Sequence, residues 1–75
     1  MTRLSRITGR EAVNALNKAG FVEVRMRGSH CFLYCKRRDR IATVPVHSGK
    51  ILAPKTLKSI LRQADMSVTQ FRKFL

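Results

Sequence analysis

Residues 21–46 contain three short strand-like segments joined by turns, and this pattern constrains the fold more than any other feature of the chain. The segments are residues 21–26, 29–36 and 41–46. The turn Arg27-Gly28 separates the first two, and a polar tip at residues 36–40 separates the second and third. Such short connections join antiparallel strands, because a parallel pair needs a much longer crossover. The sequence therefore predicts a three-stranded antiparallel sheet.

The first strand, Phe21 to Met26, has an alternating pattern. Val22, Val24 and Met26 lie on one side of an ideal strand, and Glu23 and Arg25 lie on the other. Strict alternation of apolar and polar residues is typical of a strand with one buried face. We therefore expect a half-buried strand.

The second strand has two possible inward faces, and we place Cys31, Leu33 and Cys35 toward the helices. Cys and Leu are among the residue types most often fully buried. The opposite, open face then carries His30, Phe32 and Tyr34. The inverse assignment stays open on sequence alone. In the third strand Pro45 predicts an edge position, since proline cannot donate to a ladder of hydrogen bonds.

Helical patterns flank the strands on both sides. Residues 8–11 (Thr-Gly-Arg-Glu) have the form of a capping box, and Gly20 fits the position just past a helix end. Pro54 suits the first position of a second helix. The apolar stripe of that helix has helical spacing and consists of Leu57, Ile60, Leu61 and Ala64. Basic residues lie on a different face of the helix, namely Lys55, Lys58 and Arg62.

A second capping-box pattern, Ser67 to Gln70, predicts a short C-terminal helix with Val68, Phe71 and Leu75 turned inward. The chain of 75 residues shows no linker, repeat or low-complexity tract, so we predict one domain spanning residues 1–75. The expected class is α+β, with the helices on one face of the sheet and the other face left for a ligand.

The strongest bulk signal is charge, because sixteen Lys and Arg face four Asp and Glu, for a net charge of +12. In so small a domain this excess favours a polyanionic partner, above all nucleic acid. An acidic partner protein is an alternative. An anionic membrane surface fits less well, because no basic amphipathic segment carries a large aromatic face.

No segment approaches the roughly 20 apolar residues of a membrane span, and residues 1–9 lack the apolar core of a signal peptide. Cys31 and Cys35, if they share a strand, lie roughly 13 Å apart, which is too far for a disulfide. We expect them to be buried thiols of a cytoplasmic protein.

His30 is the leading candidate for chemistry. It follows Gly28-Ser29 where the second strand opens, and the only other histidine is His47. Imidazole titrates near neutrality, so it can take up or release a proton at cellular pH. The plainer interpretation is a turn followed by a half-buried polar side chain.

Several segments together resemble the HicA toxins, also called the YcfA-like family. They are Gly20-Phe21, Gly28-Ser29-His30, residues 45–50 (PVHSGK), residues 57–64 (LKSILRQA) and Met66-Ser67. The resemblance runs from about Ile7 to Leu75. It implies a double-stranded-RNA-binding-like fold with the order α-β-β-β-α. One departure is Asp65, where the family often has Gly. Because Asp tolerates a left-handed conformation, we expect this departure to affect stability more than function.

The resemblance also implies that the chain is the toxin of a type II toxin–antitoxin system, a ribonuclease that cleaves mRNA and is neutralised by a HicB antitoxin. The family's catalytic histidine corresponds to His30. Metal-independent RNA cleavage needs a base, an acid and a positive surface around the phosphate. His47 is a possible second proton-transfer group, with an ordinary loop histidine as the alternative. No cofactor is expected.

Other residues are candidates for RNA binding, by backbone N–H groups or by charge. They are Arg27, Gly28, Ser29, Lys36, Arg37, Arg38 and Lys50. Phe32 and Tyr34 are candidates for base stacking, with core or antitoxin-contact roles as alternatives. A metal site is disfavoured because alternation turns Cys31 and Cys35 away from His30. The competing functions are a non-catalytic RNA-binding module and a protein-binding domain.

Overall fold

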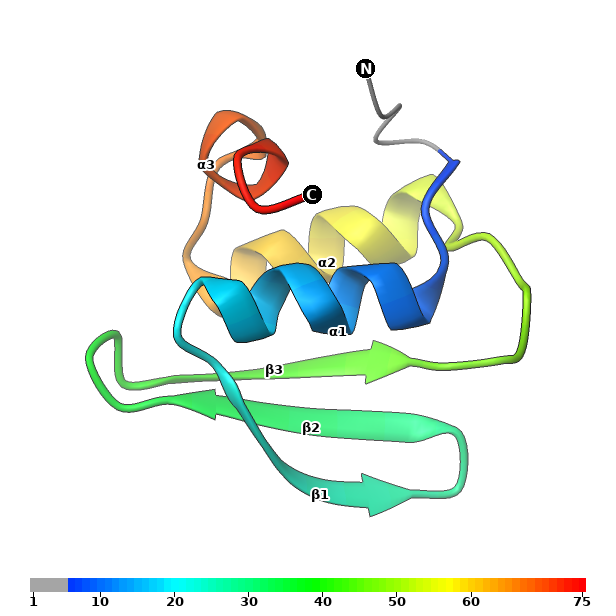
Figure 1. Cartoon of the computed structure of the whole chain (residues 1–75), viewed down its shortest axis with the longest axis horizontal. Helices are drawn as coiled ribbons and strands as arrows, with labels where there is room; N and C mark the ends of the chain where they lie inside the picture. The colour runs from blue at the N-terminus through cyan, green and yellow to red at the C-terminus, as the bar shows by residue number, and fades with distance from the viewer. Residues whose placement is uncertain (1–5) are drawn as a thin grey trace.

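The computed structural model describes residues 6–75, and it has one helix, three strands and two further helices. These are α1 (Gly9–Lys18), β1 (Val22–Arg27), β2 (His30–Cys35), β3 (Arg40–Pro45), α2 (Pro54–Ala64) and α3 (Val68–Arg72). Both strand pairs are antiparallel, in the sheet order β1-β2-β3. The helices lie together on one side of the sheet (Figure 1). The predicted α+β class and element order are confirmed.

Both predicted capping boxes are present. Thr8 Oγ1 accepts a hydrogen bond from the Glu11 N–H at 3.2 Å, and the Glu11 carboxylate accepts one from the Thr8 N–H at 2.8 Å. Ser67 and Gln70 make the same reciprocal pair at the start of α3. Pro54 begins α2 as predicted, and Asp65 ends it in the left-handed conformation, with φ 55°.

The core lies between the helices and the inner face of the sheet. The apolar stripes of α1 and α2 meet the inward residues of β2 and β3 there, and no charged or polar side chain of the described residues is buried. The largest fully buried side chains are Phe21, Phe71, Ile7, Leu16, Leu33 and Ile60. Among residues 6–75, no helix has the length and apolarity to cross a membrane.

The predicted faces of β2 are confirmed. Cys31, Leu33 and Cys35 are at most 1% exposed and face the helices. His30 is exposed, and Phe32 and Tyr34 are half-buried on the opposite face. The strand runs from His30 to Cys35, one residue shorter at each end than predicted. Pro45 lies in an edge strand, as expected, and the outer edge of that strand is partly covered because the Thr43 N–H donates to Gln63 Oε1 at 2.8 Å.

The prediction of a half-buried first strand was wrong. All six residues of β1 are exposed, because β1 is the edge strand farthest from the helices (Figure 1). A register shift between Glu23 and Arg25, centred on Val24, also breaks the alternation. Glu23 pairs with buried Leu33 and Val22 pairs with Tyr34, so the bulge exchanges the faces expected for these two residues.

One inward residue of the last helix was also wrongly predicted. Phe71 is fully buried and Leu75 is half-buried against the core, but Val68 is 42% exposed. Val68 is the first residue of a helix of five residues. So short a helix buries little more than one side chain, and Phe71 takes that place.

A candidate active site at one end of the sheet

Three strand ends meet at the end of the sheet where β2 begins. Cross-strand pairing sets Arg27, the last residue of β1, beside His30, and sets His30 beside Pro45, the last residue of β3. This is the right-hand end of the sheet in Figure 1. His30 is therefore held in the central strand, with a neighbour on each side, yet it is exposed to solvent.

The turn before His30 is tied to the segment after β3. Gly28 adopts a left-handed conformation with φ 58°, which closes the two-residue turn between β1 and β2. The Ser29 carbonyl oxygen accepts a hydrogen bond from the Val46 N–H at 2.6 Å. The two segments that carry the histidines, 28–30 and 46–47, are thus fastened to each other by backbone.

His47 and Lys50 lie in the loop that follows, and both are exposed. The Lys50 N–H donates to the His47 carbonyl oxygen at 3.0 Å, which closes a turn. Both residues line a shallow pocket of about 250 Å³, together with Pro45 and the residues that lead into α2. The structure thus gathers Arg27, His30, His47 and Lys50 at one end of the sheet.

Gly9 is a part of this site that sequence reasoning missed. A Cβ at Gly9 would overlap the carbonyl oxygen of Pro45 and touch the Cα of Val46. The N-terminus of α1 therefore lies directly against the end of β3, and only glycine fits there. Further contacts support the same loop, because the Leu52 N–H donates to the Ile7 carbonyl oxygen at 2.8 Å and Thr8 bridges to Ile51. The capping box accounts for Thr8 and Glu11 but not for a glycine at the first helical position, and this glycine is the signal in the sequence for the contact.

The basic tip between β2 and β3 is not part of this cluster. Lys36, Arg37 and Arg38 follow the far end of β2, roughly 17 Å from His30 at 3.3 Å per residue. Arg38 is also engaged in the fold, because its Nη1 donates to the Asp65 carbonyl oxygen at 2.8 Å. Arg40 lies 3.9 Å from the Asp65 carboxylate. The predicted RNA-binding residues thus fall into two groups at opposite ends of the sheet.

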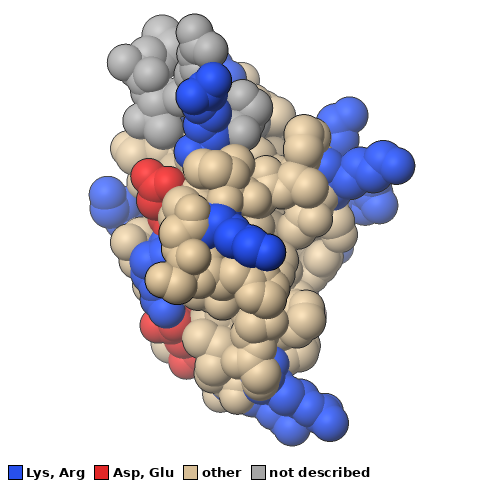
Figure 2. All heavy atoms as spheres, turned by 90° about the vertical axis from the view of Figure 1, so that its right-hand side faces the viewer, with Lys and Arg blue, Asp and Glu red and all other residues tan. Residues whose placement is uncertain are grey.

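Charged side chains are spread over the end of the molecule that carries His30 and His47. Figure 2 looks at this end and shows Lys and Arg both near its middle and around its margin, with Asp and Glu along one side only. Glu11 is held by the capping box, and Glu23 lies 3.6 Å from Arg10 on the inner side of β1. A phosphate approaching the end of the sheet thus meets an excess of positive charge.

Cys31 follows His30 but turns away from it into the core. Its thiol donates to Glu23 Oε1 at 3.3 Å. Burial, together with this hydrogen bond and the charge of Glu23, raises the pKa of the Cys31 thiol from 9.0 to about 11. A thiol of this kind is a poor nucleophile and a poor metal ligand at neutral pH. Within residues 6–75, no three His, Cys, Asp or Glu side chains are grouped as a metal site would require.

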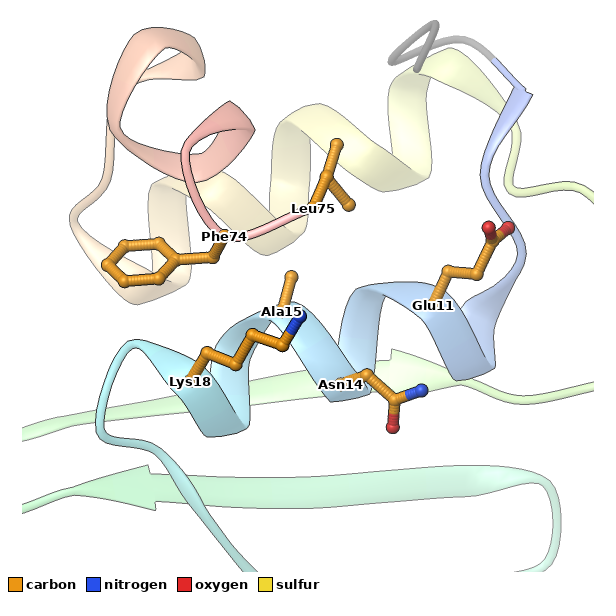
Figure 3. Close-up of a pocket in the computed structure, with 6 residues that line it drawn as sticks. All are labelled: Glu11, Asn14, Ala15, Lys18, Phe74 and Leu75. Atoms are coloured by element: carbon orange, nitrogen blue, oxygen red, sulfur yellow. The ribbon is translucent and has the colours of Figure 1, made fainter. Parts of the chain in front are cut away.

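A second pocket, of about 190 Å³, lies on the helical side of the molecule. Phe74 and Leu75 extend over α1 there, above Ala15, and Glu11 and Lys18 lie along the helix (Figure 3). No histidine or cysteine lines this pocket. Its one carboxylate, Glu11, is engaged in the capping box, so the end of the sheet is the better candidate.

The fold and the site define a class of protein: a small basic α+β domain that presents an exposed histidine at one end of a three-stranded antiparallel sheet. Residues 9–66 match the family model described as the HicA toxin of bacterial toxin–antitoxin systems. The match spans well over half the chain, which therefore belongs to the HicA toxin family and is a toxin of that kind. A comparison with curated proteins gave no match.

Proposed function

We propose that this toxin is an endoribonuclease that cleaves mRNA without a metal ion, with His30 as the general acid–base group. The observation that carries the proposal is the position of His30, exposed at the start of the central strand between Arg27 and Pro45. Membership of the HicA family supports an RNA substrate and an antitoxin partner in general terms. A HicB-type antitoxin is the neutralising partner that we infer.

The reaction we propose is an internal transesterification. The 2′-hydroxyl of a ribose attacks the adjacent phosphorus, and His30 takes up the proton of that hydroxyl. A bond forms between O2′ and phosphorus while the bond between phosphorus and O5′ breaks. The departing O5′ receives a proton, from His30 or from His47. The products are a 2′,3′-cyclic phosphate and a free 5′-hydroxyl, and no oxidant, reductant or cofactor is needed.

The surroundings of His30 suit the charge that develops on the phosphate. The backbone N–H groups at Gly28 and Ser29 lie in the turn that leads into His30, and Arg27 lies in the neighbouring strand. Lys50 lines the pocket that begins at Pro45. Donors fixed by the backbone stabilise a transition state without reorganising, which is the usual source of the largest catalytic effect. A single proton-transfer group contributes about 10²–10⁴ in rate.

Neutralisation by an antitoxin is the second part of the proposal. A partner that covers the end of the sheet at His30 would exclude RNA from it. The net charge of +12 favours an acidic partner surface, because opposite potentials steer association and fix orientation.

The test is cleavage of a labelled single-stranded RNA in EDTA by the native chain, His30→Ala and His30→Gln, with RNA binding measured in parallel. We expect both variants to lose cleavage by at least about 10²-fold and to keep RNA affinity within a factor of about two, because one contact adds little beside many phosphate contacts. Products should end in a cyclic phosphate.

Two results would overturn this assignment. Equal cleavage by the native chain and both variants would exclude His30 as the catalytic residue. Binding without cleavage by any of the three proteins would instead identify a non-catalytic RNA-binding module, the competing interpretation of the same basic surface.

A further inference from the structure

The open face of the central strand carries three side chains in a row. His30, Phe32 and Tyr34 all point away from the helices, since Cys31, Leu33 and Cys35 between them are buried. Alternate residues of a strand lie about 6.6–6.8 Å apart. The candidate catalytic histidine and the two aromatic rings are therefore evenly spaced along the strand.

The two outer strands complete this face with different chemistry. On the β1 side, Arg27 pairs with His30 and Arg25 pairs with Phe32. On the β3 side, Thr43 pairs with Phe32 and Ile41 pairs with Tyr34. Directly paired residues share a face of the sheet, so Arg27 and Arg25 flank His30 and Phe32 on the β1 side and uncharged side chains lie on the β3 side. Tyr34 lies between two exposed apolar residues, Val22 and Ile41.

The two rings are not part of the core. Both are half-buried, which reflects their place between two strands, and neither belongs to the buried cluster. The helices of the described chain all lie on the opposite face (Figure 1). Tyr34 donates a hydrogen bond to Asp39 at 3.2 Å, which holds its ring at the far end of the row. Partial burial and this bond raise the pKa of the Tyr34 phenol above its usual value.

We propose that this open face is a binding platform for single-stranded RNA, on which two successive bases stack on Phe32 and Tyr34 while the adjoining phosphate lies at His30. The proposal rests on the proposed ribonuclease function for what happens at His30, but the stacking itself is a separate property. Aromatic rings on the middle strands of an open sheet are a recurring way to bind unpaired bases. Arg27 and Arg25 lie in the neighbouring strand beside His30 and Phe32, where their guanidinium groups can bind the phosphates of the same RNA strand.

The chemistry of the face favours an unpaired RNA strand over the alternatives. A duplex keeps its bases inside and offers only phosphates and sugars, so it cannot use the two rings. The net charge of +12 and the two arginines beside the row favour a polyanion over an apolar protein surface. Stacking is also tolerant of sequence, because every base presents a flat face.

The native chain provides its own probe, because Tyr34 is the only tyrosine and tryptophan is absent. With excitation at a wavelength that phenylalanine does not absorb, the fluorescence of the protein therefore comes from Tyr34 alone. Titration with a single-stranded heptanucleotide should quench this emission in step with binding. A blunt RNA duplex bound to the same extent should not, and free N-acetyltyrosinamide corrects for absorption by the RNA.

Substitutions test the two rings separately. Phe32→Leu and Tyr34→Leu keep an apolar side chain but remove the aromatic face, and each should weaken heptanucleotide binding about 5- to 150-fold. Tyr34→Phe keeps the ring, loses the bond to Asp39, and should bind as the native chain does. Thermal unfolding of each variant checks that the sheet is intact.

Chain length separates this proposal from the proposed function. A dinucleotide whose phosphate lies at His30 reaches Phe32 but not Tyr34, so its cleavage should be slowed by Phe32→Leu and not by Tyr34→Leu. A heptanucleotide should be cleaved more slowly by both variants at low substrate concentration. If no RNA is cleaved at all, the quenching and binding measurements still test whether bases stack on Phe32 and Tyr34.

Two outcomes would overturn the platform. Heptanucleotide binding without quenching, and with unchanged affinity in both Leu variants, would show that the bases do not stack there. Unchanged RNA binding combined with weakened binding of the purified antitoxin by the same variants would identify the face as a protein interface.

Discussion

The backbone of Gly9 lies against the carbonyl oxygen of Pro45, so that the first turn of α1 and the last residue of β3 fit together only in the absence of a side chain. Pro45 is the cross-strand partner of His30, and His47 follows two residues later. A position in the first helix therefore controls the placement of both histidines.

Gly9→Ala should consequently damage both stability and activity. The new methyl group overlaps backbone atoms that cannot rotate away, and overpacking of this kind costs about 1–3 kcal/mol. Denaturant unfolding should show the loss, and RNA cleavage should fall because residues 45–47 must move. Asn17→Ala, at an exposed position of the same helix, is the control and should leave both unchanged or slightly raise stability. Equal behaviour of the two variants would contradict the tight contact.

Much of the fold follows from local sequence. The capping boxes at Thr8 and Ser67, the stripe along α2 and the alternation of β2 are each contained in a few neighbouring residues, and each is confirmed. They could be predicted because helix ends and side-chain periodicity depend on short-range geometry.

The errors in the predicted fold occur where burial depends on tertiary contacts and not on local sequence. The alternation of Val22, Glu23 and Val24 is that of a half-buried strand, but a bulge at Val24 and the place of β1 at the edge leave it exposed. The site shows the same division. His30 could be chosen as a candidate from sequence, and its distance from Lys36 follows from the length of one predicted strand. The contact of Gly9 with Pro45, in contrast, depends on how the helix packs against the sheet.

Arg38 and Lys36, two neighbours in the basic tip, should behave differently on substitution. Arg38→Ala removes the hydrogen bond to the Asp65 carbonyl oxygen and should lower the free energy of unfolding by about 1 kcal/mol. Lys36 is exposed and should be replaceable by Ala within about 0.5 kcal/mol. Urea unfolding of both variants measures the difference, and an equal loss in the two would refute the anchoring role of Arg38.

Lys36→Ala should instead affect RNA binding, and only for long RNA. Lys36 is six residues from His30, roughly 20 Å along the strand, so a short oligonucleotide at the site does not reach it. For RNA long enough to reach the tip, Lys36→Ala should reduce the slope of log affinity against log salt concentration by about 0.7, the value for one lost phosphate contact. A change in dinucleotide binding would place Lys36 in the site itself, against the arrangement described above.

The buried thiol of Cys31 should be unreactive in the folded chain. With its pKa raised from 9.0 to about 11, the thiolate fraction at pH 8 falls about a hundredfold, and burial slows access further. Alkylation by iodoacetamide, followed by mass spectrometry in a Cys35→Ala background, should be slow at pH 8 and fast in urea. Rapid modification of the folded chain would show that the thiol is open to solvent.

The same pKa has a consequence for stability at alkaline pH. The folded state holds the proton of Cys31 up to about pH 11, whereas the unfolded chain releases it near pH 9.0. The stabilisation is therefore complete below pH 9.0 and is lost as the pH rises toward 11. Cys31→Ala should remove this contribution to the fall in the free energy of unfolding at alkaline pH. Urea unfolding of the native chain and the variant at pH 8 and pH 10 measures it.

His30 and His47 should be separable by the step that each supports. If His30 takes the proton of the 2′-hydroxyl and His47 supplies a proton to O5′, then His47→Ala should slow cleavage by about 10²-fold or more. A substrate with sulfur in place of the bridging 5′-oxygen has a leaving group that needs no proton. Cleavage of this substrate should be restored in His47→Ala and should remain slow in His30→Ala. Restoration in His30→Ala alone would reverse the two roles, and a His47→Ala variant as active as the native chain would leave His30 to act at both steps.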